Sequence, residues 1–146
     1  MKKTLKNTAV VLACLLLLST SALAAENIKP LSSSYIYGTF SDIIPENNGK
    51  LLITFHLNSP APMTTLGASS IDIYENNGRT TKLVDTVYAT DPGYEHMMGD
   101  GTYHASNITF DGTVGYRYYV KVHFTAKDSS GGDTVISTSP TVTAKK

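Results

Sequence analysis

The chain has 146 residues, and its twelve basic and twelve acidic side chains give a formal net charge of zero. It contains nine tyrosines, no tryptophan and a single cysteine. The balanced charge gives no electrostatic reason to expect nucleic acid or anionic lipid as a partner, and a single cysteine excludes an intramolecular disulfide.

Residues 1–24 have the pattern of a secretory signal peptide. Three lysines among the first six residues precede an apolar run over residues 9–18, and Ala22-Leu23-Ala24 is a small-x-small cleavage site. The apolar run is too short for a membrane span, so we expect export by the general secretory route and cleavage near Ala24. Cys14 would be lost with the signal. We expect no membrane attachment afterwards and a secreted, extracellular protein.

The mature chain is expected to fold as one domain. Cleavage removes three lysines, which leaves nine basic and twelve acidic residues and a formal charge of minus three. About 120 residues suffice for a packed core, since domains of that size bury roughly two-thirds of their unfolded surface. We predict an N-terminal segment at residues 25–33 and a single β-sandwich domain at residues 34–146.

The mature chain reads as short strands separated by turns. Clusters of Gly, Asn, Asp and Pro recur about every ten residues between segments rich in Tyr, Thr and Val. Ser59-Pro60-Ala61-Pro62 predicts a loop that extends to about Ala68, because proline has no N–H to donate within a sheet. The predicted strands are 35–44, 50–58, 70–74, 81–89, 102–110, 116–127 and 133–143.

Residues 116–127 have the longest strict alternation and are predicted to form the central strand. One parity is mostly apolar and faces the core, whereas the other carries Tyr119 and His123 and faces water. Residues 50–58 alternate in the same way, with His56 on the wet face. Residues 81–89 are expected to turn two apolar side chains inward. The side chains predicted to be buried are Leu51, Ile53, Phe55, Leu57, Leu83, Val87, Tyr116, Tyr118, Val120, Val122, Phe124 and Ala126.

Gly115 to Val122 resembles the Tyr-x-Val-x-Val strand of fibronectin type III and immunoglobulin-like domains. The resemblance implies a seven-stranded antiparallel immunoglobulin-like β-sandwich, in which Tyr116 or Tyr118 hydrogen-bonds back to the preceding corner. That family usually has a buried tryptophan in an earlier strand, and this chain has none.

The whole chain is also similar to a group of small secreted proteins of Gram-positive bacteria that have no assigned function. The shared motifs are Leu66-Gly67-Ala68, Ile71 to Gly78, Met97-Met98-Gly99 and Gly131 to Thr134. This second resemblance covers nearly the whole chain and implies no activity.

Residues 91–104 gather the side chains that suggest a metal site. His96 and His104 with a nearby acidic side chain would suit a divalent metal, and Met97 or Met98 would suit reduced copper. No histidine pair has the spacing of a zinc site, and no calcium-loop motif is present. The alternative is that the methionines fill the open end of the sandwich, because flexible side chains fit irregular gaps.

No pattern in the chain indicates catalysis. There is no Gly-x-Ser-x-Gly elbow, no His-Glu-x-x-His pair and no cysteine in the mature chain. We therefore predict no enzymatic activity, no cofactor and no metal.

Binding is the function that the sequence favours. Outward tyrosines can stack on sugars or anchor a protein interface, although tyrosine is also a common half-buried strand residue. We expect a monomer that binds an unknown extracellular protein or glycan. The alternative is a metal-binding extracellular protein that uses residues 91–104. The residues predicted to contact a ligand are Tyr94, His96, Met97, Met98, Tyr119 and His123.

Assembly through an edge strand is a third possibility. Residues 35–44 or 133–143 would extend a sheet into another chain, and Pro140 with the two terminal lysines would oppose this.

Overall fold

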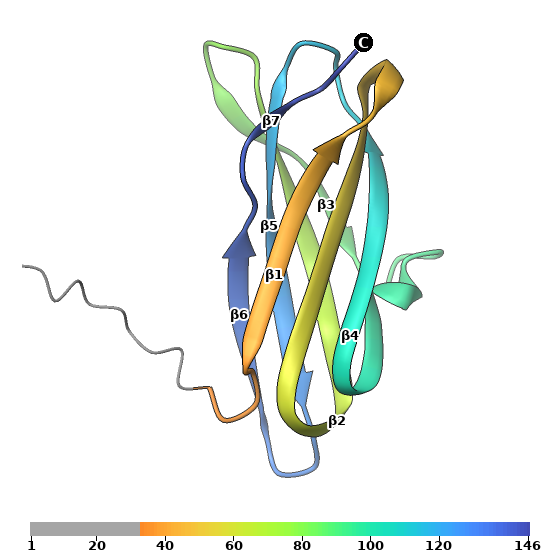
Figure 1. Cartoon of the computed structure of the whole chain (residues 1–146), viewed down its shortest axis with the longest axis vertical. Helices are drawn as coiled ribbons and strands as arrows, with labels where there is room; N and C mark the ends of the chain where they lie inside the picture. The colour runs from red at the N-terminus through yellow and green to blue at the C-terminus, as the bar shows by residue number, and fades with distance from the viewer. Residues whose placement is uncertain (1–32) are drawn as a thin grey trace, which may run out of the picture. The chain divides into compact units, whose positions relative to one another are not determined.

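The computed structural model describes residues 33–146, which form seven antiparallel strands and two 3-10 helices (Figure 1). The expected all-β antiparallel architecture is therefore confirmed. The predicted signal peptide, residues 1–24, lies outside the described residues, as does nearly all of the segment 25–33. In the described part, no helix has the length and apolar character needed to cross a membrane. The elements are β1 Gly38–Pro45, η1 Asn47–Gly49, β2 Lys50–Asn76, β3 Thr81–Tyr88, η2 Glu95–Met97, β4 Met98–Asp111, β5 Arg117–Lys127, β6 Gly132–Thr138 and β7 Val142–Thr143.

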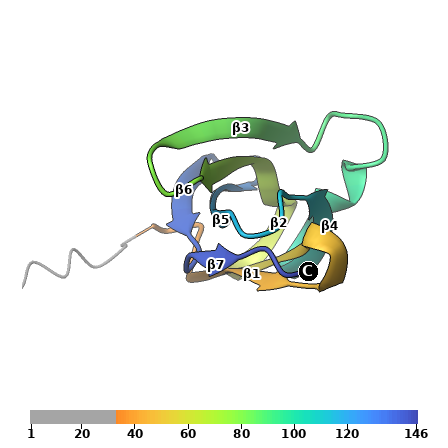
Figure 2. The same ribbon diagram turned by 90° about the horizontal axis from the view of Figure 1, so that it is seen from above.

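β2 organises the sheet, because it pairs with β1, β3, β4 and β5. Its first part, residues 50–58, lies between β1 and β4. Its last part, residues 70–76, lies between β3 and β5. β6 and β7 continue the sheet beyond β5. β1 and β3 consequently lie on opposite sides of the core (Figure 2).

The prediction that a loop extends from Ser59 to about Ala68, before a short strand at 70–74, is wrong. β2 runs through this region without interruption. Residues 59–62 have no cross-strand partner, as expected for a stretch with two prolines, but pairing with β4 resumes at Met63. β4 bends beside β2, and both strands turn back at the lower end of Figure 1. The prolines thus mark a corner and not the end of the strand.

The alternation predicted for two strands is confirmed. The five inward-facing side chains of β5, from Tyr118 to Ala126, are fully buried. In the first part of β2, the four inward-facing side chains are buried as well, namely Leu51, Ile53, Phe55 and Leu57. The rings of Phe55 in β2 and Phe124 in β5 meet edge to face, with centroids 6.2 Å apart. The two sets of paired strands therefore share one core. β5 pairs with three strands and β2 with four, so β2 is more central than the strand that we predicted to be central.

Leu83 does not point inward as predicted. A register shift between Ile73 and Tyr74 leaves Val84 without a cross-strand partner and places Leu83 opposite Tyr74. This bulge reverses the parity of β3, so Leu83 is 50% exposed on the outer face. Val87, beyond the bulge, is buried as predicted.

β1 and β6 are edge strands, since β1 pairs only with β2 and β6 only with β5. The Ser41 and Ser137 hydroxyls are 2.8 Å apart and join these two edges across the open side. Pro140 lies between β6 and β7, so the segment predicted as one strand over 133–143 is divided into two strands.

Candidate binding surface

The predicted ligand-contacting residues fall in two separate places. Tyr94, His96 and Met97 lie in the connection between β3 and β4, and Met98 is the first residue of β4. Met97 is fully buried in the core, because η2 turns it inward. Met97 therefore presents no exposed surface to a ligand, and its burial agrees with the alternative that it fills the core.

The two histidines of residues 91–104 hold the connection against β4. His96 Nε2 lies 3.0 Å from the backbone oxygen of Asn107, and His104 Nε2 lies 3.0 Å from that of His96. The Tyr94 ring stacks beside His96, with centroids 6.3 Å apart. Each imidazole therefore uses one ring nitrogen in a hydrogen bond to a backbone oxygen. Among residues 33–146, no group of three His, Cys, Asp or Glu side chains is arranged to hold a metal ion, so the metal-binding alternative gains no support.

Tyr119 and His123 lie on the outer face of β5, beside side chains of β2. Tyr74 and Tyr119 are cross-strand partners, and their rings stack face to face with centroids 4.8 Å apart. Lys121 Nζ lies 5.1 Å from the centre of the Tyr74 ring, which is a cation–π distance. The stack fixes both tyrosines in place and covers part of their ring faces.

Asp72 orders the histidine of this face. His123 Nε2 donates to Asp72 Oδ2 at 2.9 Å, and the Thr86 hydroxyl donates to Asp72 Oδ1 at 2.8 Å. Three strands are joined by this carboxylate. Both side chains of the pair are only partly exposed, so the contact is a fixed feature of the surface.

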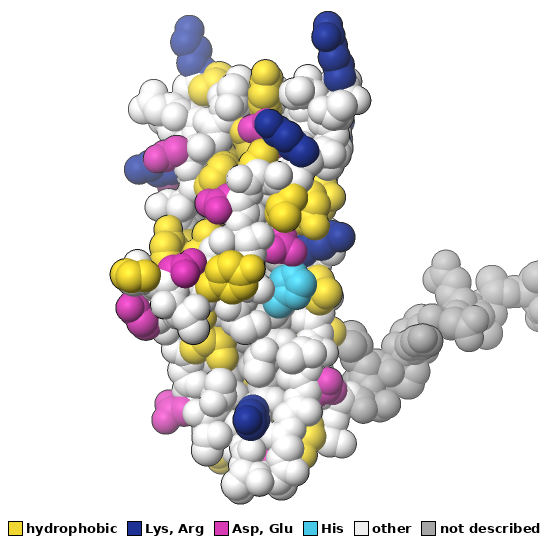
Figure 3. Space-filling view, turned by 180° about the vertical axis from the view of Figure 1, so that it is seen from behind, with side chains coloured by type: hydrophobic (Ala, Val, Ile, Leu, Met, Phe, Trp, Pro, Cys, Tyr) yellow, Lys and Arg dark blue, Asp and Glu magenta, His cyan; other side chains and the backbone are white. Residues whose placement is uncertain are grey.

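Three large apolar side chains are half exposed around this polar pair. Leu83 lies opposite Tyr74, Tyr88 opposite Ser70, and Ile136 opposite His123, so all three belong to one outer face. Their exposed fractions are 50%, 51% and 56%. Figure 3 is seen from the β3 side and shows hydrophobic side chains interspersed with acidic and basic ones and a histidine. We call this surface the β3–β5–β6 face, and its residues are Asp72, Tyr74, Leu83, Tyr88, Tyr119, Lys121, His123 and Ile136.

A second aromatic row, which we did not predict from the sequence, lies on the outer face of β1, β2 and β4. The Phe40 and His56 rings stack with centroids 5.0 Å apart, and Tyr103 adjoins His56 at 5.7 Å. The sequence signal was present, since His56 was expected to face water. The row forms only because β1, β2 and β4 pair in this register, and the register cannot be predicted from any one of these segments.

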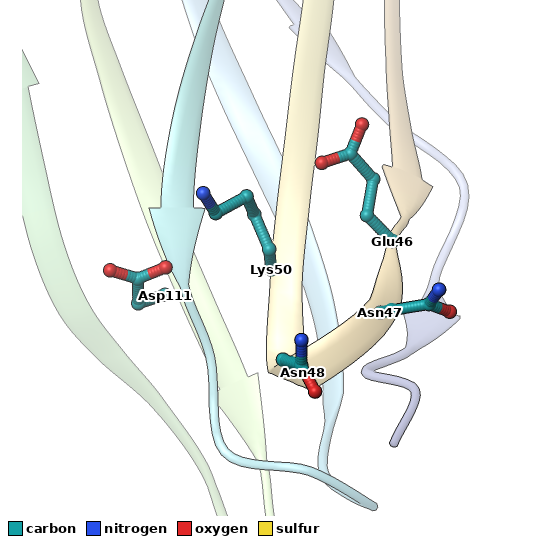
Figure 4. Close-up of a pocket in the computed structure, with 5 residues that line it drawn as sticks. All are labelled: Glu46, Asn47, Asn48, Lys50 and Asp111. Atoms are coloured by element: carbon teal, nitrogen blue, oxygen red, sulfur yellow. The ribbon is translucent and has the colours of Figure 1, made fainter.

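A polar hollow lies at the turn between β1 and β2 (Figure 4). Lys50 lies between Glu46 and Asp111, and the side chains of Asn47 and Asn48 complete the rim. No aromatic or aliphatic side chain lines the hollow, so it lacks the apolar wall that small-molecule sites usually have. Its polar and charged side chains are typical of a solvent-exposed turn.

No protein-family model, curated protein or solved structure matches the chain. The function proposed below therefore rests on the sequence pattern and on the geometry of residues 33–146.

Proposed function

We propose that the protein is a secreted, non-enzymatic, immunoglobulin-like module that binds an extracellular protein through the β3–β5–β6 face. The observation that carries the proposal is the half-exposure of Leu83, Tyr88 and Ile136 on one rigid surface. Large exposed apolar side chains around a few ordered polar groups are typical of protein interfaces, where a few anchor side chains contribute most of the binding energy. Secretion is inferred from the signal pattern of residues 1–24.

Two structural features support the immunoglobulin-like assignment. The set β1–β2–β4 and the set β3–β2–β5–β6 face one another across a shared core, with β2 contributing to both. The Tyr118 hydroxyl accepts the backbone N–H of Thr113 at 2.8 Å. This is the bond back to the preceding corner that the resemblance implies, and Tyr118 makes it in place of Tyr116.

A protein partner fits the β3–β5–β6 face better than a glycan does. Sugars stack on uncovered aromatic ring faces, but Tyr74 and Tyr119 cover one another and Lys121 lies over Tyr74. The most exposed side chains include Leu83 and Ile136, which are aliphatic and offer nonpolar contact area. Such side chains match an apolar protein surface.

Site-specific photo-crosslinking in the secreting organism tests the proposal. A photoreactive residue at position 83 or 136 is expected to capture the same protein, while one at Thr109, exposed on the outer face of β4, is expected to capture none. Leu83→Asp and Ile136→Asp should each weaken binding of the captured protein by about tenfold or more, and Thr109→Asp should leave it unchanged. Equal labelling from all three positions, or aspartate variants that bind normally, would exclude this face as the interface.

A further inference from the structure

The outer face of β1, β2 and β4 carries a small hollow on the side of the core opposite the β3–β5–β6 face. Its volume is about 250 Å³, slightly below the range of sites that take drug-sized ligands. A ligand that fits it would be about the size of a single ring with substituents. The residues around it include Phe40, Thr54, His56, Ala105, Ser106 and Asn107.

One wall of the hollow is aromatic. Phe40 stands on the edge strand β1 and stacks on His56 with an angle of 13° between the ring planes. Despite this stack, Phe40 is 46% exposed, and Tyr103, next in the row, is 56% exposed. The aromatic rings of this row are therefore exposed to solvent and are not part of the core.

The other wall is polar and uncharged. Thr54 of β2 and Asn107 of β4 are cross-strand partners on the same outer face. Asn107 engages His96 through its backbone oxygen. Within the described chain, its side-chain amide, the Thr54 hydroxyl and both ring nitrogens of His56 make no hydrogen bond. These groups include donors and acceptors that are available to a ligand. An acid, Asp42, is the β1 partner of Thr54.

We infer that this hollow binds one ring of a neutral glycan. A pyranose has an apolar C–H face that stacks on an aromatic ring, and hydroxyls that both donate and accept hydrogen bonds. Phe40 matches the first property, and Thr54 with Asn107 matches the second. The Asp42 carboxylate beside Thr54 disfavours an anionic sugar by charge repulsion.

The site is separate from the protein-binding face proposed above. On the β3–β5–β6 face, Tyr74 and Tyr119 cover one another and Lys121 lies over Tyr74, beside aliphatic side chains. In the hollow, Phe40 stacks on His56 and is still 46% exposed, beside side-chain amide and hydroxyl groups. The two faces lie on opposite sides of the core, so one molecule has room for both partners at once.

An NMR titration of the ¹⁵N-labelled protein with maltose, cellobiose, N,N′-diacetylchitobiose and sialyllactose tests the inference. We expect at least one neutral disaccharide to shift the backbone amides of His56, Ser106 and Asn107 in a saturable way. The dissociation constant should lie near about 1 mM, because a single ring contributes few contacts. Sialyllactose should bind more weakly than the best neutral sugar.

Phe40→Ala should weaken that binding about tenfold, and Asn107→Ala by severalfold. Leu83→Ala, on the other face, is the matched control and should leave the affinity unchanged. Both Phe40 and Asn107 are exposed, so we expect their variants to keep the thermal midpoint of the parent. The inference is overturned if no neutral disaccharide shifts these amides, or if the shifts map to the β3–β5–β6 face.

Discussion

The Tyr118 side chain links β5 to the preceding corner and to β2. It is fully buried, and its hydroxyl accepts the Thr113 N–H and donates to Glu75 Oε2 at 2.5 Å. Gly112 makes room for the ring, because a Cβ there would lie 2.9 Å from it. The buried hydroxyl is thus satisfied on both sides, which is the condition for burying a polar group at little cost.

Tyr118→Phe should destabilise the fold although it removes only one atom. The Thr113 N–H and the Glu75 carboxylate would lose their partner, and a partly buried polar group left unpaired costs about 1–3 kcal/mol. Urea unfolding measures the loss. Tyr119→Phe is the control, since the Tyr119 hydroxyl makes no hydrogen bond within the described chain, and a loss of equal size in both variants would contradict the assignment.

The same hydroxyl should make stability fall at alkaline pH. Burial, and then the hydrogen bond to Glu75, raise the pKa of Tyr118 above its usual value of 10.0. The folded protein therefore keeps the proton longer than the unfolded chain does. The contribution is complete below about pH 10 and is lost as the pH rises through the folded-state pKa. The unfolding free energy of the parent should fall more steeply than that of Tyr118→Phe between about pH 9 and about pH 11; parallel curves would count against a raised pKa.

Met97 is expected to matter for stability. Its side chain is fully buried, so Met97→Ala should cost about 2–5 kcal/mol by leaving a cavity. Met98→Ala, at a half-buried position, should cost less. Chemical denaturation of both variants compares them, and near-equal midpoints would show that Met97 is not a core residue.

At the scale of the strands, local patterns were predicted well and long-range registers were not. The alternation in β5 and in residues 50–58 correctly gave the buried faces, because a strand with one wet side shows its orientation in its own sequence. The bulge at Val84 reverses parity without a local signal, so Leu83 was misplaced. Pro60 and Pro62 led to the wrong prediction that the strand ends there. Proline suits an unpaired bend within a strand as well as it suits a loop, so the sequence does not distinguish the two.

For the candidate surfaces too, the local pattern was predicted and the long-range pairing was not. Tyr119 and His123 were recognised as outward residues, but their partners Tyr74 and Asp72 lie on β2 and follow only from the pairing with β5. The row that contains Phe40 depends on three strands, so single-strand patterns could not predict it.

At Gly67, β2 passes close to the backbone of the β3–β4 connection. The φ of Gly67 is +147°, and a Cβ there would lie 2.3 Å from the backbone oxygen of Met97. Gly67→Ala should therefore cost about 3 kcal/mol or more, or prevent folding, because backbone has to move. Gly38→Ala is the control, since nothing lies within 4 Å of a Cβ there. Thermal unfolding that ranks the two variants equally would contradict this close contact.

For the whole molecule, folding must bring distant segments together. Ser41 and Ser137, which join the β1 and β6 edges, are 96 residues apart in sequence. Domains dominated by such pairings lose much chain entropy before they gain contacts, so they fold slowly. We expect stopped-flow refolding on a timescale of about milliseconds to seconds. A refolding phase complete within microseconds would contradict the pairing order described above.

The placement of β1 has a mechanical consequence. β1 begins at Gly38, opposite Asn58, whereas the backbone oxygen of Lys145 accepts the Gly49 N–H at the turn beyond the other end of β1. Tension applied through Gly38 and Lys145 would pull along the strands and load the eight paired positions of β1 and β2 in shear. Because antiparallel hydrogen bonds run perpendicular to such a pull, they would have to break together and not one after another. The ladder between β1 and β2 would then resist extension of the chain as one cooperative unit.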